Sequence, residues 1–161
     1  MAAATHTPDV IHENVAPRHD VEVAQGHRIA VEIRSPDGPI WTGFAKSLQV
    51  PESLGLMGIM PRHAALLATL VAGLTTIHAE DGQVVKLITG DGFLEIARNR
   101  VLMLVDFGEA PGKVDVKRAQ EARDRAISRL RTPAEDVDYA RAEAALRRAL
   151  VRLRFGGQPE V

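Results

Sequence analysis

The sequence contains no cysteine and few aromatic residues, and both shortages narrow the possible functions. Without cysteine the chain has no disulfide, no thiol nucleophile and no thiolate-bound zinc. Aromatic residues make up 4% of the 161 residues, which disfavours nucleic-acid binding by base stacking. The longest mainly apolar run, residues 64–74, is too short to span a bilayer core of about 30 Å. We therefore expect membrane association only through other proteins.

Motifs of common catalytic sites are also missing from the sequence. It has no Gly-rich phosphate loop of the Walker type, no His-Glu-x-x-His and no Gly-x-Ser-x-Gly. Gly90-Asp91-Gly92 falls between predicted strands and is interpreted as a turn. His63 has no nearby nucleophile, so we interpret it as a buried or interface histidine. We predict no catalytic residue, no metal site and no required cofactor.

Residues 1–26 show no sustained hydrophobic period and are predicted to be a disordered extension. The histidines of this extension, His6, His12 and His19, are sparse. We interpret them as solvated side chains rather than metal ligands.

Residues 27–110 are predicted to form a β domain. Ile29, Val31 and Ile33 alternate with more polar residues, as in a strand with one buried face. Residues 35–39 form a turn signal, because proline fixes φ and glycine tolerates positive φ. Further strands are predicted to start at Ile40 and to cover residues 45–50, 58–60, 73–79, 83–89, 93–96 and 101–105. Many short strands separated by turns indicate an antiparallel sandwich or barrel.

Residues 111–155 are predicted to form a helical hairpin, with a short tail at 156–161. Apolar residues recur at helical spacing in two runs separated by residues 131–133. Asp115 is a candidate N-cap of the first helix, and residues 132–135 form a capping box for the second, with Asp136 as a competing cap. Because much of each apolar stripe is alanine, we expect a close, shallow helix seam that opens at modest cost.

The helical region is basic, whereas the rest of the chain is acidic. Residues 114–154 hold 11 Lys and Arg against 7 Asp and Glu, a charge of +4 in a chain of net charge −1. Arg118 and Arg125 share one face of the first helix, and Arg148 and Arg152 share one face of the second. Converging guanidinium groups suit phosphate oxygens. The hairpin is therefore a candidate polyphosphate site, with a solvated basic face as the alternative.

Three motifs stand in a fixed order along the chain. Gly58-Ile59-Met60-Pro61 is followed by His63, then comes Gly92-Phe93-Leu94-Glu95-Ile96, and residues 137–142 open a basic, Ala-rich helix. Together they resemble the epsilon subunit of bacterial F-type ATP synthase, over about residues 29–153. The resemblance implies an α+β, mainly β fold, in which an N-terminal flattened antiparallel β-sandwich is followed by a C-terminal two-helix antiparallel hairpin.

The resemblance also implies a function. Members of that family are non-catalytic subunits of the central stalk, which couple gamma to the c ring in a proton- or sodium-translocating rotary enzyme. Their helical hairpin switches between a folded state and an extended state, which restrains ATP hydrolysis through contacts with the catalytic alpha and beta subunits. The implied location is the cytoplasmic side of the bacterial inner membrane, where the complex holds the subunit peripherally.

Some members of that family bind ATP as a regulatory ligand through Ile/Leu-Asp-x-x-Arg-Ala and later arginines. Residues 114–119, Val-Asp-Val-Lys-Arg-Ala, resemble this motif with valine at the first position. The resemblance implies an ATP site that favours the folded hairpin. Its residues would be Glu109, Asp115, Arg118, Arg125, Arg148 and Arg152.

The loop region before His63 departs from the family pattern. Leu54 and Leu56 stand where acids are common, and Arg62 replaces the usual glycine before the histidine. We therefore expect an apolar partner interface toward gamma and the c ring, with partial burial of these side chains in the sandwich as the alternative. Its residues would be Leu54, Leu56, Met57, Met60 and His63.

A nucleic-acid-binding module with a basic helical arm is the main alternative function. The acidic β half and the few aromatic residues count against it. A small β-barrel enzyme would need a convergent acid–base pair, and the sequence gives no sign of one.

Overall fold

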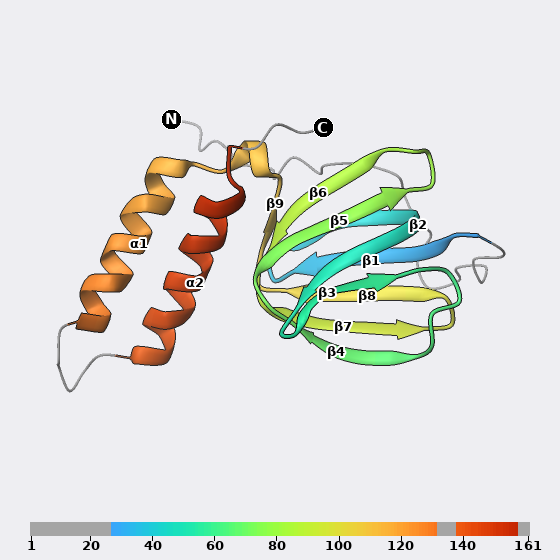
Figure 1. The fold of residues 1–161 in the computed structure, drawn as a ribbon, viewed down its shortest axis with the longest axis horizontal. Coiled ribbons are helices and arrows are strands. Elements are labelled where there is room, and N and C mark those ends of the chain that lie inside the picture. The colour runs from blue at the N-terminus through green and yellow to red at the C-terminus, as the bar shows by residue number, and fades with distance from the viewer. Residues whose placement is uncertain (1–26, 132–137, 158–161) are drawn as a thin grey trace, which may run out of the picture.

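The computed structural model describes residues 27–131 and 138–157. Within these residues the chain forms nine β-strands, one short 3-10 helix and two α-helices. The strands build a sandwich, and the two helices form a hairpin beyond one end of it (Figure 1). This confirms the predicted order of a β domain followed by a helical hairpin.

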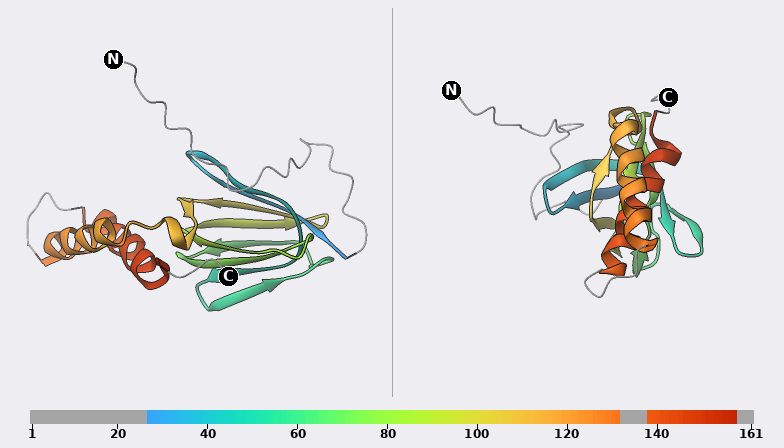
Figure 2. Two further views of the ribbon diagram at one scale, coloured as in Figure 1. Left: turned by 90° about the horizontal axis from the view of Figure 1, so that it is seen from above. Right: turned by 90° about the vertical axis from the view of Figure 1, so that its left-hand side faces the viewer.

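The sandwich is made from one sheet that folds over itself (Figure 2). Its hydrogen-bonded order is β1-β8-β7-β4-β2-β5-β6-β9, and β2 also pairs with β1 and β3. The β1–β8 pair is parallel and the other strand pairs are antiparallel. The strands are β1 (Ile29–Ser35), β2 (Gly38–Glu52), β3 (Gly55–Ile59), β4 (Leu66–Leu70), β5 (Gly73–Ala79), β6 (Val84–Thr89), β7 (Gly92–Ala97), β8 (Arg100–Val105) and β9 (Gly108–Glu109).

The long strand β2 belongs to both layers of the sandwich. It pairs with β1 through residues 38–45 and with β5 and β3 through residues 45–52. Its register shifts between Ala45 and Ser47, and such an irregularity lets a strand bend from one layer to the other. The sequence predicted two separate strands here, so that detail was wrong.

The hydrophobic core lies between the two layers. Ile29, Val31 and Ile33 are all buried, as their period-two spacing predicted, and they join one cluster with Leu48 and Met103. A buried leucine or isoleucine contributes about 1.5–3 kcal/mol through removal of its apolar surface from water. The alternation in β1 is therefore what fixes its register in the sandwich.

Strand β4 was not predicted from the sequence. It lies in the apolar stretch 64–74, which lacks the polar alternation that marks a half-buried strand. The reason is visible in the structure, since Ala68 packs against the core while Leu67 on the opposite face is 73% exposed. Apolar residues thus occur on both faces of this strand.

The helices are η1 (Pro111–Lys113), α1 (Val116–Arg131) and α2 (Tyr139–Phe155). The carboxylate of Asp115 accepts a hydrogen bond from the backbone N–H of Arg118 at 2.9 Å, which confirms the predicted cap. Asp138 caps α2 in the same way, accepting from the N–H of Arg141 at 2.9 Å. The capping box predicted at residues 132–135 and the competing cap Asp136 lie outside the described residues.

The seam between the two helices is lined by alanine. Ala119 and Ala126 of α1 and Ala142 and Ala149 of α2 are all buried. Small side chains allow a close approach of the helices but remove little apolar area from water. The predicted shallow seam is therefore present.

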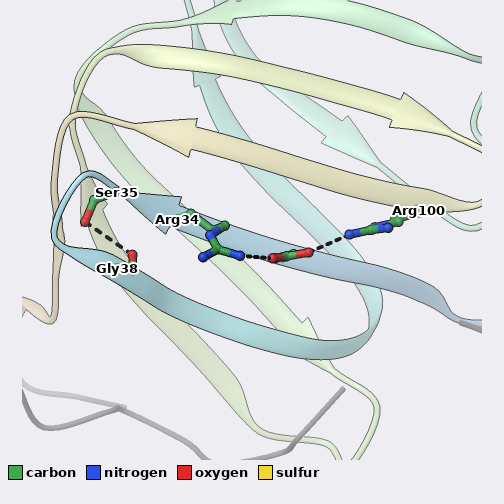
Figure 3. A network of polar contacts seen from close by, with 5 residues as sticks. Arg34, Ser35, Gly38 and Arg100 are labelled. Carbon is green, nitrogen blue, oxygen red and sulfur yellow. Dashed lines mark hydrogen bonds and ion pairs between the residues drawn. The ribbon is translucent and has the colours of Figure 1, made fainter. Parts of the chain in front are cut away.

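Charged side chains join β1 to β8 (Figure 3). The carboxylate of Glu32 accepts hydrogen bonds from Arg34 at 3.0 Å and from Arg100 at 2.5 Å. Partial burial raises the pKa of Glu32, but the hydrogen bonds and positive charges of these arginines outweigh it and leave the pKa lowered. Beside this cluster the hydroxyl of Ser35 donates to the carbonyl of Gly38 at 3.4 Å and closes the β1–β2 turn.

Candidate functional site

Helix α2 lies between α1 and the sandwich (Figure 1) and contacts the sandwich through two arginines. The Nε of Arg152 lies 2.5 Å from Oε1 of Glu109, and its guanidinium lies 4.1 Å from the centre of the Phe107 ring. One turn and a residue earlier, Arg147 pairs with Asp91 at 3.3 Å. The other carboxylate oxygen of Asp91 accepts the backbone N–H of Ala72 at 2.7 Å. The hairpin is therefore docked by these polar contacts together with apolar residues of α2 such as Val151, which is buried.

The end of α2 is also tied to the connection between the domains. The N–H of Gly157 donates to the carbonyl of Pro111 at 3.1 Å. A side chain at Gly156 would meet the carbonyl oxygen of Arg152 at 2.5 Å and the side chain of Val114 at 2.7 Å. Glycine is needed there because the chain passes so close to its own connection.

The six residues predicted to bind ATP lie in and beside the docked hairpin. Glu109 and Arg152 contact each other, and the Asp115 carboxylate is occupied by the α1 cap. Arg125 pairs with Glu121 on its own helix at 3.8 Å. Arg118 is exposed and Arg148 half-buried, and among the described residues neither side chain has a hydrogen bond or ion pair.

The antiparallel hairpin brings one arginine of each helix to the same height and leaves the other two at different heights. Arg118 near the start of α1 lies at the same end of the hairpin as Arg152 near the end of α2. Counted at 1.5 Å per residue from the open end of the hairpin, Arg125 and Arg148 differ in height by about one helical turn. The two guanidinium groups without an ion pair among the described residues, those of Arg118 and Arg148, could each donate forked hydrogen bonds to phosphate oxygens.

Three of the five predicted interface residues are exposed. Leu54, Leu56 and Met60 are 96%, 69% and 64% exposed. Met57 instead packs against the core, and His63 is half-buried with Nδ1 2.9 Å from the carbonyl oxygen of Ala64. The apolar surface at the β2–β3 turn is thus narrower than the sequence predicted.

A second apolar surface was missed by sequence reasoning. Leu67 of β4, Phe93 of β7 and Leu104 of β8 lie on the outer face of three neighbouring strands and are 73%, 58% and 49% exposed. The signal was present in the sequence, because residues 101–105 and most of the stretch 64–74 are apolar at successive positions. Exposed apolar residues that gather on one face of a sheet mark an interaction surface.

Residues 27–131 and 138–157 contain no group of three or more His, Cys, Asp or Glu side chains placed to hold a metal ion. Neither α1 nor α2 is long and apolar enough to cross a membrane.

The fold and the docked hairpin define the class, which is a β-sandwich carrying a C-terminal pair of helices. Residues 28–124 match the family described as the ATP synthase delta/epsilon chain, beta-sandwich domain. Residues 113–156 match the family described as the ATP synthase delta/epsilon chain, long alpha-helix domain. The chain belongs to the delta/epsilon family of ATP synthase subunits.

Similar proteins agree with this assignment. The ATP synthase epsilon chain of Moorella thermoacetica is 38% identical over 127 residues, which are 79% of this chain and 95% of that protein. The ATP synthase epsilon chain of Symbiobacterium thermophilum is 42% identical over 113 residues, which are 70% and 81% of the two chains. The fold is similar to a chain in the mitochondrial ATP synthase of Euglena gracilis, with a TM-score of 0.68 at 18% identity, over 78% of this chain and 79% of that one.

Proposed function

We propose that this protein is a non-catalytic rotor subunit of an F-type ATP synthase that joins gamma to the c ring in the central stalk. The family membership and the two apolar surfaces on the sandwich support this proposal. The face around Leu67, Phe93 and Leu104 is suited to gamma, and the exposed Leu54, Leu56 and Met60 near the β2–β3 turn are suited to the c ring. The subunit is then peripheral on the cytoplasmic side of the bacterial inner membrane, held there by the complex alone.

The hairpin is the movable part of this rotor subunit, and its docking contacts are the observation that carries the proposal. An exposed ion pair contributes about 0–1 kcal/mol, a partly screened charged hydrogen bond about 1–1.5 kcal/mol, and a cation–π contact at an exposed site about 0.5–1 kcal/mol. The pairs Arg147–Asp91 and Arg152–Glu109 with the Phe107 ring therefore hold α2 with only a few kcal/mol of polar free energy. A docked state favoured by so small a free energy can exchange with an extended state when a partner or a ligand is added.

In the extended state the hairpin carries its charge of +4 to the catalytic alpha and beta subunits. Exposed arginines of α1 and α2 then contact acidic surfaces of those subunits and restrain ATP hydrolysis. Arg129 and Arg154 have no ion pair with the sandwich among the described residues and are not part of the candidate ATP site, so replacing them should not undock the hairpin. In the reassembled enzyme the variant Arg129→Gln/Arg154→Gln should relieve inhibition, and full inhibition by this variant would contradict the contact.

ATP acts on this switch as a ligand of the docked hairpin. Its phosphates would be held by the unpaired Arg118 and Arg148, with Arg152 at the height of Arg118, Arg125 about one turn from Arg148, and Glu109 and Asp115 beside them. A ligand that contacts both helices binds only the closed hairpin, and at 100 times its dissociation constant it would favour that state by about 2.7 kcal/mol. The cellular ATP concentration then sets the fraction of subunits in which the hairpin is docked and does not restrain ATP hydrolysis.

Calorimetric titration of the full chain with ATP tests this part of the proposal. We expect saturable binding that is lost in Arg118→Ala and in Arg148→Ala, because each removes one unpaired guanidinium group. Arg129→Ala, another exposed arginine of α1, is the matched control and should bind ATP normally. Equal loss in all three variants, or no binding to the parent chain at millimolar ATP, would reject the nucleotide site and leave the stalk assignment in place.

A further inference from the structure

A groove of about 700 Å³ lies between the docked helix α2 and the sandwich. Leu56 and Leu74 line it from the sandwich, and Leu150 and Phe155 line it from α2. Small-molecule sites typically occupy about 300–1,000 Å³ and are lined mainly by apolar side chains. The groove lies on another side of α2 from the Arg152–Glu109 pair, and neither of those residues lines it.

The charged side chains that line the groove are basic. Arg147 and Arg154 line it, and none of its described lining residues is acidic. Arg147 already pairs with Asp91. Arg154 has no ion pair among the described residues, and its guanidinium lies 5.2 Å from the centre of the Phe155 ring. The groove therefore offers an apolar floor with one uncommitted cation beside it.

We propose that this groove binds a single-chain alkyl carboxylate, such as a free fatty acid, with its carboxylate on Arg154 and its chain between α2 and the sandwich. The planar guanidinium fork matches the two oxygens of a carboxylate. The chain would cover Leu150, which is 48% exposed in the docked structure, and lie against Leu74 of the sandwich, which removes apolar surface from water.

This occupant contacts both domains at once, so the site is complete only while α2 is docked. A ligand of this kind shifts the hairpin toward the docked state by its affinity difference for the two states. The alkyl carboxylate would thus be a second ligand that stabilises the docked hairpin, at a site separate from the ATP site.

Titration of the full chain with dodecanoate below its micellar concentration, followed by amide chemical shifts, tests the proposal. We expect one saturable site with shifts at both Leu74 and Leu150, and a dissociation constant raised about tenfold or more in Arg154→Gln, since a charged hydrogen bond is lost. Arg141→Gln, an exposed arginine at the start of α2 outside the groove, should bind as the parent does. Leu150→Gln should weaken binding by making the floor polar.

Probes of opposite head-group charge distinguish a site that recognises the carboxylate from nonspecific binding of alkyl chains. Dodecyltrimethylammonium carries the same chain with a positive head and should not bind at this groove. Equal binding of both probes, an unchanged affinity in Arg154→Gln, or shifts confined to the outer face of β4, β7 and β8 would overturn the proposal. None of these results bears on the ATP titration.

Discussion

The contact between Arg152 and Glu109 should account for much of the docking free energy of the hairpin. Their side chains are 29% and 28% exposed, so the charged hydrogen bond is partly screened and should contribute about 1–1.5 kcal/mol. The Phe107 ring adds about 0.5–1 kcal/mol through its contact with the guanidinium. Arg152→Ala should thus raise the undocked population about thirtyfold, and Glu109→Gln, which keeps the ring contact, about fivefold to tenfold.

The absence of cysteine makes a thiol-labelling assay possible. Val151 is 7% exposed and lines the groove between α2 and the sandwich. The labelling rate of Val151→Cys therefore follows the undocked population, however small it is. Ala126→Cys, buried in the seam between the helices, is the control for opening of the hairpin itself and should not label faster in Arg152→Ala.

A double-mutant cycle separates the pair from unrelated effects. Combining Glu109→Gln with Arg152→Ala should give about the rate of Arg152→Ala alone, because the second change removes an interaction that is already lost. Arg141→Ala should leave the rate unchanged, since Arg141 lies outside the docking contacts. Fully additive effects, or a rate that Arg152→Ala does not alter, would refute the docking role of the pair.

Three further changes test the sandwich. Arg62 has φ of +67°, which is unfavourable for a residue with a Cβ, so Arg62→Gly should raise the free energy of unfolding in urea by about 0.5–1 kcal/mol while Arg62→Ala should not. Leu48 is fully buried, so Leu48→Ala should lower that free energy by about 2–5 kcal/mol, whereas Leu54→Ala on the surface should change it by less than about 0.5 kcal/mol. Because the pKa of Glu32 is lowered in the folded state, its stabilising effect is present above the unfolded pKa of about 4.3 and is lost as the pH falls through the lower folded value. Glu32→Gln should therefore flatten the acid side of the stability profile, and an equal loss at pH 7 and pH 3 would contradict that sign.

The sandwich was predictable where one face of each strand is polar. The alternation around Ile29, Val31 and Ile33 fixed both the strand and its buried side. β4 and the exposed face at Leu67 were missed because apolar residues on both faces erase that period. The continuity of β2 was missed because a bend across two layers depends on its partners rather than on its own residues.

The candidate site was predictable in its residues but not in its pairings. Spacing alone placed Arg118 with Arg125 and Arg148 with Arg152, since each pair lies on one helix. It gave no sign that Arg152 would pair with Glu109 while Arg148 remained unpaired, because which face of α2 meets the sandwich is decided by packing. The groove between α2 and the sandwich likewise exists only in the docked arrangement.

The effect of ATP on the labelling rate of Val151→Cys tests the central claim most directly. At 100 times the dissociation constant, ATP should lower the rate about a hundredfold, because it stabilises the docked hairpin by about 2.7 kcal/mol. The decrease should vanish when Arg118→Ala is added to the same chain. A rate that stays the same at saturating ATP would contradict a hairpin switched by nucleotide, even if ATP binds.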